Sequence, residues 1–289
     1  MREGTATANG VEFIYLHDGP PDGPLALCLH GFPDSAPTWR HLLPALADAG
    51  YHAVAPWLRG YAPTAVPDDG CYQTGALVAD ATALHDVLGG DGDAVVIGHD
   101  WGATAAYGAA CYQPQRWRRV VAMAVPPPAA MSADLFTYEQ TRRSFYIFFF
   151  QTPLAEAAVA ANDMVFLERL WANWSPGYDG AEDVANVKRS LTRPENLAAA
   201  IGYYRAMFDP SLHQPSYADA QLAAGGTPSQ PTLYLHGADD GCLGVEILGD
   251  VAGVLAAGSA VEIVAGAGHF LHLDRPDEVN KAVLSFVGS

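Results

Sequence analysis

The sequence has few cysteines, few basic residues and no long apolar run, and each shortage argues against a class of protein. Its four cysteines (Cys28, Cys71, Cys111, Cys242) lie far apart without CxxC spacing, which argues against a disulfide-stapled secreted domain and predicts reduced, buried thiols. The 15 Lys and Arg against 32 Asp and Glu give a formal net charge of -17, which opposes binding to nucleic acid and anionic membranes. No stretch approaches about 18 uncharged apolar residues, and the N-terminus lacks a secretory pattern, so we expect a cytoplasmic protein.

Apolar residues are abundant, at 50% of a 289-residue chain, which is enough for one large core with or without a smaller subdomain. Short apolar runs bounded by Gly, Pro and Asp predict buried strands, and longer segments with apolar residues at helical spacing predict helices between them. This alternation predicts an α/β fold with a mostly parallel central sheet covered by helices on both faces. The predicted strands are 25–31, 51–57, 94–100, 120–126, 232–238 and 260–266, and the predicted helices are 39–49, 72–88, 102–112 and 276–287.

The alternation stops in the middle of the chain, where about a hundred residues have the pattern of helices and loops without a clear strand. We interpret residues 127–228 as a helical cap inserted into a core formed by residues 1–126 and 229–289. The most aromatic segment of the chain, residues 142–153, lies within this predicted cap. The sequence therefore predicts a core that carries a separate helical subdomain.

Residues 97–103, IGHDWGA, combine the end of a predicted strand, a Gly-x-Asp-x-Gly turn and the start of a helix. Small residues around a nucleophile permit the tight strand-to-helix turn that lifts its side chain above a sheet. Taken alone, Asp100 fits a helix N-cap equally well. As a nucleophile, a carboxylate attacks carbon without a base, but water must then hydrolyse the resulting ester. That step needs a base, an acid that orients the base, and donors for an oxyanion.

The C-terminal part of the chain offers candidates for the base and the orienting acid. His269 lies in a glycine-rich loop, GAGHF, between the last predicted strand and the last helix, and His272 is the weaker candidate. Asp240 follows the preceding strand in GADDG, and we expect its neighbour Asp239 to bond backbone amides in the turn, although sequence alone leaves that choice open. The order nucleophile, acid, His is the one expected of this architecture.

Two turns offer backbone N–H groups for an oxyanion hole. Phe32 lies in HGFP directly after the first clear core strand, and Trp101 follows the predicted nucleophile. HGFP alone is a common turn. Together with the Gly-x-Asp-x-Gly turn, it predicts two amides at one edge of the sheet.

With these motifs assembled, the chain resembles the epoxide hydrolases of the α/β-hydrolase superfamily over essentially its whole length. The resemblance implies a hydrolase with a catalytic triad of Asp100, Asp240 and His269, which opens an epoxide to a vicinal diol through an ester on Asp100. It implies neither a metal nor an organic cofactor. The strings that carry it are HGFP (30–33), LRGY (58–61), GHDWG (98–102), GADD (237–240) and GAGHF (266–270).

The resemblance also implies two cap tyrosines that hold and protonate the epoxide oxygen. Tyr204 in GYYRAMF matches one and Tyr146 in FYIFFFQTP the other, with Tyr203 as the neighbour to test as an alternative. The run FFF, 148–150, is interpreted as cap packing and a pocket wall that receives an apolar substituent. The predicted substrate-binding residues are Phe32, Trp101, Phe149, Tyr146 and Tyr204.

Three other functions fit parts of this pattern. A haloalkane dehalogenase shares the fold and the Asp nucleophile, but it needs side-chain N–H donors for a halide, and the sequence offers a clear one only in Trp101. A fluoroacetate dehalogenase would carry Arg at that position. The third alternative is a non-catalytic ligand receptor on the same fold. We expect a small apolar epoxide and water as partners, no nucleic acid or membrane, and a monomer or homodimer.

Overall fold

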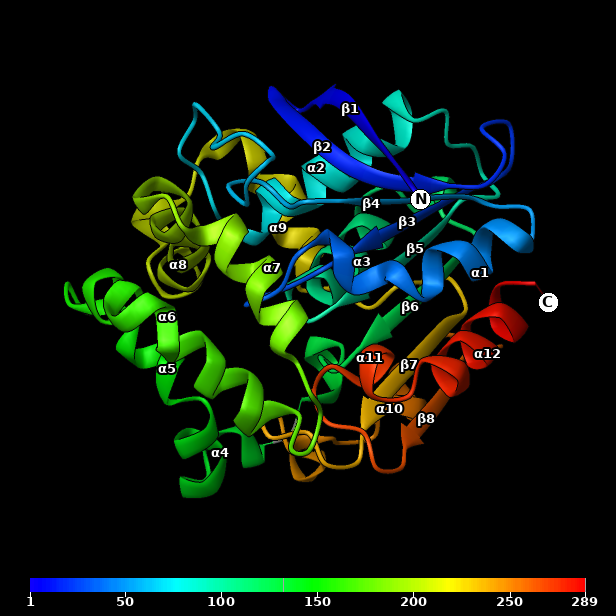
Figure 1. Cartoon of the computed structure of the whole chain (residues 1–289). Helices are drawn as coiled ribbons and strands as arrows, with labels where there is room; N and C mark the ends of the chain where they lie inside the picture. The colour runs from blue at the N-terminus through cyan, green and yellow to red at the C-terminus, as the bar shows by residue number, and fades with distance from the viewer. Residues whose placement is uncertain (132, 289) are drawn as a thin grey trace.

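The computed structural model describes residues 1–131 and 133–288 (Figure 1). Within this part of the chain, eight strands form one sheet in the order β1-β2-β4-β3-β5-β6-β7-β8. The strands from β4 across to β8 are parallel, whereas β1 and β2 pair antiparallel with each other and β2 pairs antiparallel with β4. The strands are β1 (Arg2–Ala8), β2 (Val11–Asp18), β3 (Leu25–Leu29), β4 (His52–Pro56), β5 (Val95–His99), β6 (Arg119–Met123), β7 (Thr232–Gly237) and β8 (Ala260–Val264).

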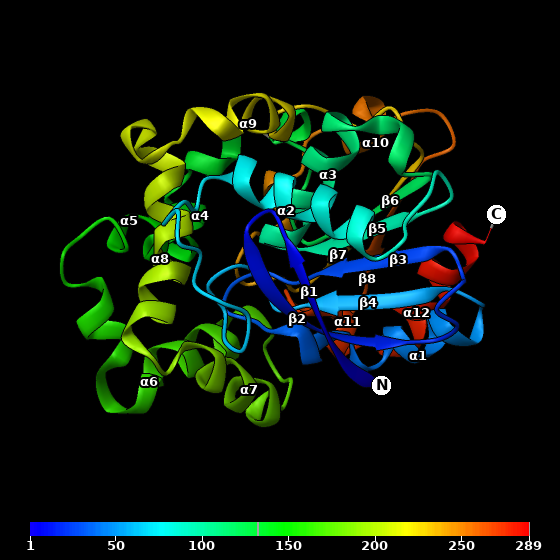
Figure 2. The same cartoon turned by 90° about the horizontal axis from the view of Figure 1, so that it is seen from above.

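Helices cover both faces of the sheet. Figure 2 shows α2, α3 and α9 on one face and α1, α11 and α12 on the other. The central strands are buried along their whole length because both of their faces are covered, which explains their unbroken apolar sequences. The predicted α/β fold is therefore confirmed. The helices are α1 (Leu42–Asp48), α2 (Thr74–Val87), α3 (Trp101–Tyr112), α4 (Tyr138–Arg143), α5 (Phe145–Phe149), α6 (Ala155–Trp174), α7 (Ala181–Leu191), α8 (Pro194–Phe208), α9 (Ala218–Ala224), α10 (Val251–Val254), α11 (Leu271–Asp274) and α12 (Pro276–Val287).

The segment between β6 and β7 contributes helices and, in its described residues, no strand to the sheet. Helices α4, α5, α6 and α8 gather beyond one end of the sheet, at the left of Figure 1. In contrast, α9 packs on α2 and α3, beside the sheet. The exact division into a core and a cap remains a prediction. Among the described residues, no helix has the length and apolar character needed to cross a membrane.

The four cysteines are free thiols. Three of them, Cys28, Cys71 and Cys242, are buried as the sequence predicts, but Cys111 near the end of α3 is only half-buried. The expectation of four buried thiols is therefore wrong at this one position.

The carboxyl ends of β3, β5, β7 and β8 meet at one edge of the sheet, because these strands are parallel. Each of these ends leads into a turn that carries a predicted site residue. In an open α/β sheet this edge is the usual place for a ligand site. The residues concerned are Phe32 after β3, Asp100 after β5, Asp240 after β7 and His269 after β8.

Candidate active site

Asp100 occupies a strained turn between β5 and α3, with φ 54° and ψ -120°. The turn is crowded on both sides. A Cβ on Gly102 would lie 2.0 Å from the Leu29 carbonyl oxygen, and one on Gly31 would lie 2.2 Å from Asp100 Oδ1. Although Asp100 directly precedes α3, its side chain accepts no capping hydrogen bond from that helix. The helix-cap interpretation of this aspartate is therefore wrong.

The Asp100 carboxylate points to the turn after β3, where the Phe32 backbone N–H donates to Asp100 Oδ1 over 2.7 Å. His30 fixes this turn: Leu58 N–H donates to His30 Nε2 over 3.0 Å, so the proton resides on Nδ1, which donates to the Gly31 carbonyl over 2.9 Å. Burial lowers the pKa of His30 to about 4, so the ring stays neutral. The HGFP and LRGY strings thus meet in one hydrogen-bonded unit that presents an amide to the carboxylate.

Trp101 is the first residue of α3. The first N–H groups of a helix have no acceptor inside the helix, and the helix dipole favours negative charge at that end. The Trp101 amide is therefore suited to the second oxyanion donor, a role that remains a prediction.

His269 lies between two carboxylates. Its Nδ1 bonds Asp240 Oδ2 over 2.9 Å, and its Nε2 is 3.6 Å from Asp100 Oδ2. The other oxygen of Asp240 accepts from the backbone N–H groups of Cys242 (2.7 Å) and Leu243 (2.9 Å). The structure thus brings all three predicted triad residues together, with the imidazole fixed by an acid that is itself fixed by backbone amides.

The two neighbouring candidates lie outside this arrangement. Asp239 is exposed, and it is Asp240 that bonds backbone amides in the turn, contrary to the sequence-based expectation. His272 bonds Thr38 Oγ1 through Nε2 over 2.6 Å, and its ring stacks on Trp39 at 4.9 Å between centroids. His272 is therefore engaged elsewhere.

The charges of the three groups depend on one another. Burial alone would lower the pKa of His269, but the carboxylates of Asp240 and Asp100 outweigh it and raise that pKa above its ordinary value. Burial alone would raise the pKa of Asp240, but His269 holds it below the ordinary value. We therefore infer an imidazolium between two carboxylates in the resting protein at neutral pH.

Two cap tyrosines lie among the aromatic rings of this site. The Tyr204 ring is 5.2 Å from those of Phe32 and Trp101, and 5.5 Å from that of Tyr146. The Tyr204 hydroxyl is buried and finds no acceptor within the described residues, whereas Tyr146 Oη lies 3.4 Å from Cys242 Sγ. Burial is the main cause that raises the pKa of both phenols well above the ordinary value. Both therefore carry their protons at neutral pH.

Tyr203, the alternative to Tyr204, is engaged by its own hydrogen bond. It donates to the Arg59 carbonyl over 2.8 Å, and its ring stacks on Tyr72 at 5.8 Å. Successive residues of a helix point about 100° apart, so α8 directs Tyr203 toward the LRGY segment and Tyr204 toward Phe32.

Comparison with known proteins identifies the family of this chain. Residues 24–276 match the family model described as the alpha/beta hydrolase fold. The chain belongs to the alpha/beta hydrolase family. It is 32% identical to epoxide hydrolase A of Mycobacterium tuberculosis, covering 96% of this chain and 95% of that protein, and 30% identical to epoxide hydrolase 3 of Xenopus tropicalis, covering 96% and 75%. These relatives place it with the epoxide hydrolases of that family.

Solved structures agree with this placement. The crystal structure of epoxide hydrolase A from Mycobacterium thermoresistibile has a TM-score of 0.81 at 30% identity, covering 100% of this chain and 98% of that one. The Bacillus megaterium epoxide hydrolase in complex with an inhibitor has a TM-score of 0.81 at 25% identity, covering 99% of this chain and all of that one.

The predicted substrate-binding residue Phe149 lies farther from the other site rings than its neighbour Phe150 does. Phe149 is half-buried and stacks on Phe166 at 6.0 Å, whereas the buried ring of Phe150 lies 5.5 Å from Phe32 and 5.2 Å from Tyr204. The substrate-binding role of Phe149 stays a prediction, and Phe150 is a second candidate from the same run.

No sequence motif points to Trp174, at the end of α6, whose ring also lies beside the predicted site. Its ring lies 5.0 Å from Tyr146 and 5.1 Å from His269. Its carbonyl accepts from the His269 N–H over 2.8 Å, and Ser175 Oγ accepts from the Phe270 N–H over 3.0 Å. The end of α6 therefore holds the loop that carries the predicted base.

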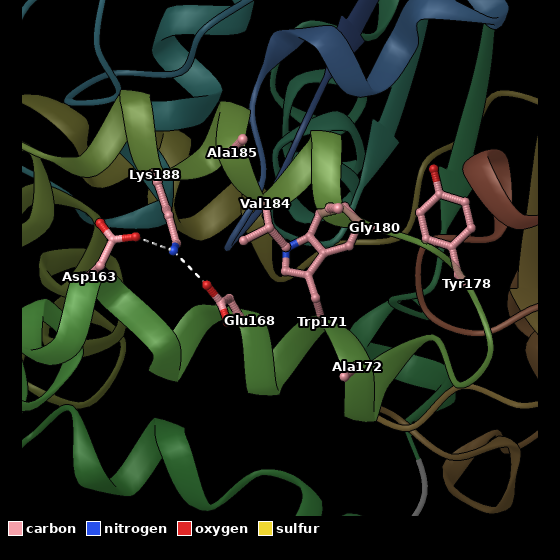
Figure 3. A pocket seen from close by; sticks show the side chains of 10 residues that line it. Asp163, Glu168, Trp171, Ala172, Tyr178, Gly180, Val184, Ala185 and Lys188 are labelled. Atoms are coloured by element: carbon pink, nitrogen blue, oxygen red, sulfur yellow. Dashed lines mark hydrogen bonds and ion pairs between the residues drawn. The ribbon is translucent and has the colours of Figure 1, made fainter.

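A surface pocket lies between α6 and α7, and Figure 3 shows its lining side chains. Lys188 forms ion pairs there with Asp163 (2.7 Å) and Glu168 (2.6 Å). Trp171 lines the pocket as well, and its indole N–H donates to the Pro33 carbonyl over 2.7 Å. Among the described residues that line this pocket there is no member of the predicted site.

Among the described residues, two buried groups contain side chains of the kinds that can bind a metal ion. One consists of Asp240, Cys242 and His269 and is already joined by the hydrogen bond between His269 and Asp240. The other consists of Asp34, His99 and His272, whose ligand atoms lie within 4.8 Å of one another, with 3.9 Å between His99 Nδ1 and Asp34 Oδ2. Bonds of about 2.0–2.1 Å put tetrahedral zinc ligands about 3.4 Å apart. In the second group, the 3.9 Å between His99 Nδ1 and Asp34 Oδ2 exceeds that ligand spacing.

Proposed function

We propose that this chain is an epoxide hydrolase that converts an epoxide to a vicinal diol through a covalent ester on Asp100. The observation that carries the proposal is the presence of two buried, protonated phenols, Tyr146 and Tyr204, around an aspartate at a nucleophile position. A carboxylate nucleophile suits an alkyl carbon, and phenol donors suit an oxygen leaving group that becomes an alcohol. The relatives named above are themselves epoxide hydrolases.

In the first step, Asp100 attacks an epoxide carbon from the side opposite the C–O bond. The Phe32 amide holds Oδ1, so we assign the attacking role to Oδ2 and expect Oδ1 to become the ester carbonyl oxygen. Tyr146 and Tyr204 bind the departing oxygen and supply its proton. The product of this step is an alkyl ester with a free hydroxyl group on the adjacent carbon.

In the second step, water attacks the Asp100 carbonyl carbon while His269 removes a proton from it. Negative charge then develops on Oδ1, next to the Phe32 amide that already contacts this atom and the Trp101 amide at the start of α3. Asp240 holds the imidazole in orientation through Nδ1. The ester breaks to release the diol and the carboxylate.

The proton balance closes without a metal or an organic cofactor in the proposed route. Ester formation transfers one proton from a phenol to the epoxide oxygen. The resting imidazolium of His269 then returns its Nε2 proton to the phenolate. Ester hydrolysis consumes one water, places one of its protons on the departing alkoxide and leaves the other on His269. The sum is one epoxide and one water to one diol.

The test of this route is a single-turnover hydrolysis of styrene oxide in 18O-labelled water. Because the first diol takes its new oxygen from Asp100, it should carry no label, and label should enter the Asp100 carboxylate instead. Mass spectrometry of the diol and of the peptide that contains residue 100 measures both. A first diol that carries the label would mean direct attack by water and would overturn the ester.

A second assay separates this function from a haloalkane dehalogenase and from a non-catalytic ligand receptor. The site offers phenol O–H donors, which suit an epoxide oxygen, whereas a halide needs N–H donors from side chains. We expect styrene oxide to be hydrolysed and 1-bromobutane to release no bromide at a comparable rate. Faster bromide release would favour a dehalogenase, and tight binding of a small apolar ligand without turnover of either compound would favour a receptor.

A further inference from the structure

Cys242 lies where the orienting acid and the cap meet. Its backbone N–H donates to Asp240 Oδ1 over 2.7 Å, and its carbonyl accepts from Gln140 Nε2, on α4, over 2.9 Å. Its Sγ is 3.4 Å from Tyr146 Oη, on α5. The residue is 1% exposed. It therefore contacts the acid through the main chain and the cap tyrosine through the thiol.

The two phenols of the site differ in their hydrogen bonds because of this contact. Tyr204 Oη, which the Trp101 side chain approaches as a donor, finds no acceptor in the described part of the chain, whereas Tyr146 Oη is engaged by the thiol. Sulfur is a weak acceptor and a thiol is a weak donor, so such a bond directs the phenol without binding it strongly. An epoxide oxygen that develops negative charge is a stronger acceptor and displaces it.

The same thiol is unsuited to compete with Asp100 for the epoxide. Burial is the main cause that raises the pKa of Cys242 well above its ordinary value, and the nearby Asp240 and Asp100 charges act in the same direction. The thiolate is the nucleophilic form of cysteine. A neutral thiol at this position can hold a phenol without being alkylated in place of the carboxylate.

Resting on the proposed function, we propose that Cys242 is a positioning residue that directs the Tyr146 hydroxyl toward the epoxide. Tyr204, whose hydroxyl proton has no acceptor, is free to bond the epoxide oxygen, and Tyr146 joins by leaving the thiol. Since Asp240 is held by the main chain of Cys242 and not by its side chain, the thiol serves ester formation only. Ester hydrolysis does not depend on it.

The test uses single-turnover reactions with styrene oxide, quenched at intervals and analysed by intact-protein mass spectrometry, which follows the rise and decay of the ester. Cys242→Ala should slow ester formation by about three- to tenfold, the effect of one neutral hydrogen bond, and leave ester decay unchanged. Cys242→Ser keeps a donor and an acceptor and should recover most of the rate. Cys111→Ala, which removes the half-buried thiol on α3, is the matched control and should alter neither step.

A double-mutant cycle distinguishes positioning from packing. In a Tyr146→Phe background the thiol has no hydroxyl to hold, so Cys242→Ala should have no further effect on ester formation. Equal slowing in both backgrounds would show that Cys242 only fills space, and slower ester decay would show that its side chain acts on the second step. Either result would overturn the inference. A wild-type chain that turns over no epoxide would instead overturn the proposed function, and this inference with it.

Discussion

Replacing His269 by glutamine should separate the two proposed steps. Nε2 lies 3.6 Å from Asp100 Oδ2, so the substitution removes no hydrogen bond from the nucleophile, and it takes away a positive charge that stabilises the resting carboxylate. Ester formation should therefore survive. Ester hydrolysis loses its general base, which typically contributes about 10²- to 10⁴-fold. Because the second step then becomes far slower than the first, the ester should accumulate to nearly one equivalent per chain.

The assay is intact-protein mass spectrometry after mixing His269→Gln with an excess of styrene oxide. We expect the mass to rise by that of one substrate molecule, with the added mass located in the peptide that contains Asp100. The matched control is His272→Gln, because His272 is equally buried but bonds Thr38 instead of the triad. This control should turn over without an adduct. An unmodified His269→Gln chain that has lost diol production would refute the ester or the assignment of the base.

Three further predictions follow from the same geometry. Gly31→Ala should slow ester formation by about 10²-fold in single-turnover assays, because a Cβ 2.2 Å from Asp100 Oδ1 must displace the carboxylate. Tyr204→Phe should lower that rate by about 10²- to 10⁴-fold, whereas Tyr203→Phe should spare it and destabilise the fold by about 1 kcal/mol in urea unfolding, through loss of the bond to the Arg59 carbonyl. The folded-state pKa of His269 lies above its ordinary 6.5, so protonation of this residue stabilises the folded protein. That stabilisation is complete below about pH 6.5 and is lost as pH rises through the folded-state pKa. The unfolding free energies of wild type and His269→Gln should therefore converge at alkaline pH.

The parallel part of the fold could be predicted because its physical cause is local. A strand covered on both faces must be apolar throughout, and a helix that covers it must show helical periodicity. The β1–β2 hairpin was missed, although its turn is Asn9-Gly10, with φ 48° and 76°, a pair that favours tight hairpins. Its strands are half-exposed and lack the apolar run on which the other strand predictions depended.

Some site residues could likewise be predicted from the sequence, and others could not. Asp100, Asp240 and His269 lie in turns that directly follow strands, so topology alone brings them to one edge of the sheet. Which of Tyr203 and Tyr204 faces the site, and which ring of the run 148–150 does, depends on how a cap helix is rotated about its axis. That rotation is set by tertiary packing, which no local pattern encodes.

Within the proposed mechanism, the charge of Asp100 also controls when His269 becomes a base. In the resting protein the two carboxylates raise the pKa of His269, so its Nε2 carries a proton and cannot accept one from water. Ester formation neutralises Asp100 and removes one of those two charges, which lowers the pKa of the imidazole and lets its Nε2 proton pass to the phenolate left by the first step. Asp240, held by two backbone amides, keeps the ring in place through this change. The nucleophile therefore prepares the base for the second step only after the first has occurred, and water meets an active base only when an ester is present to be hydrolysed.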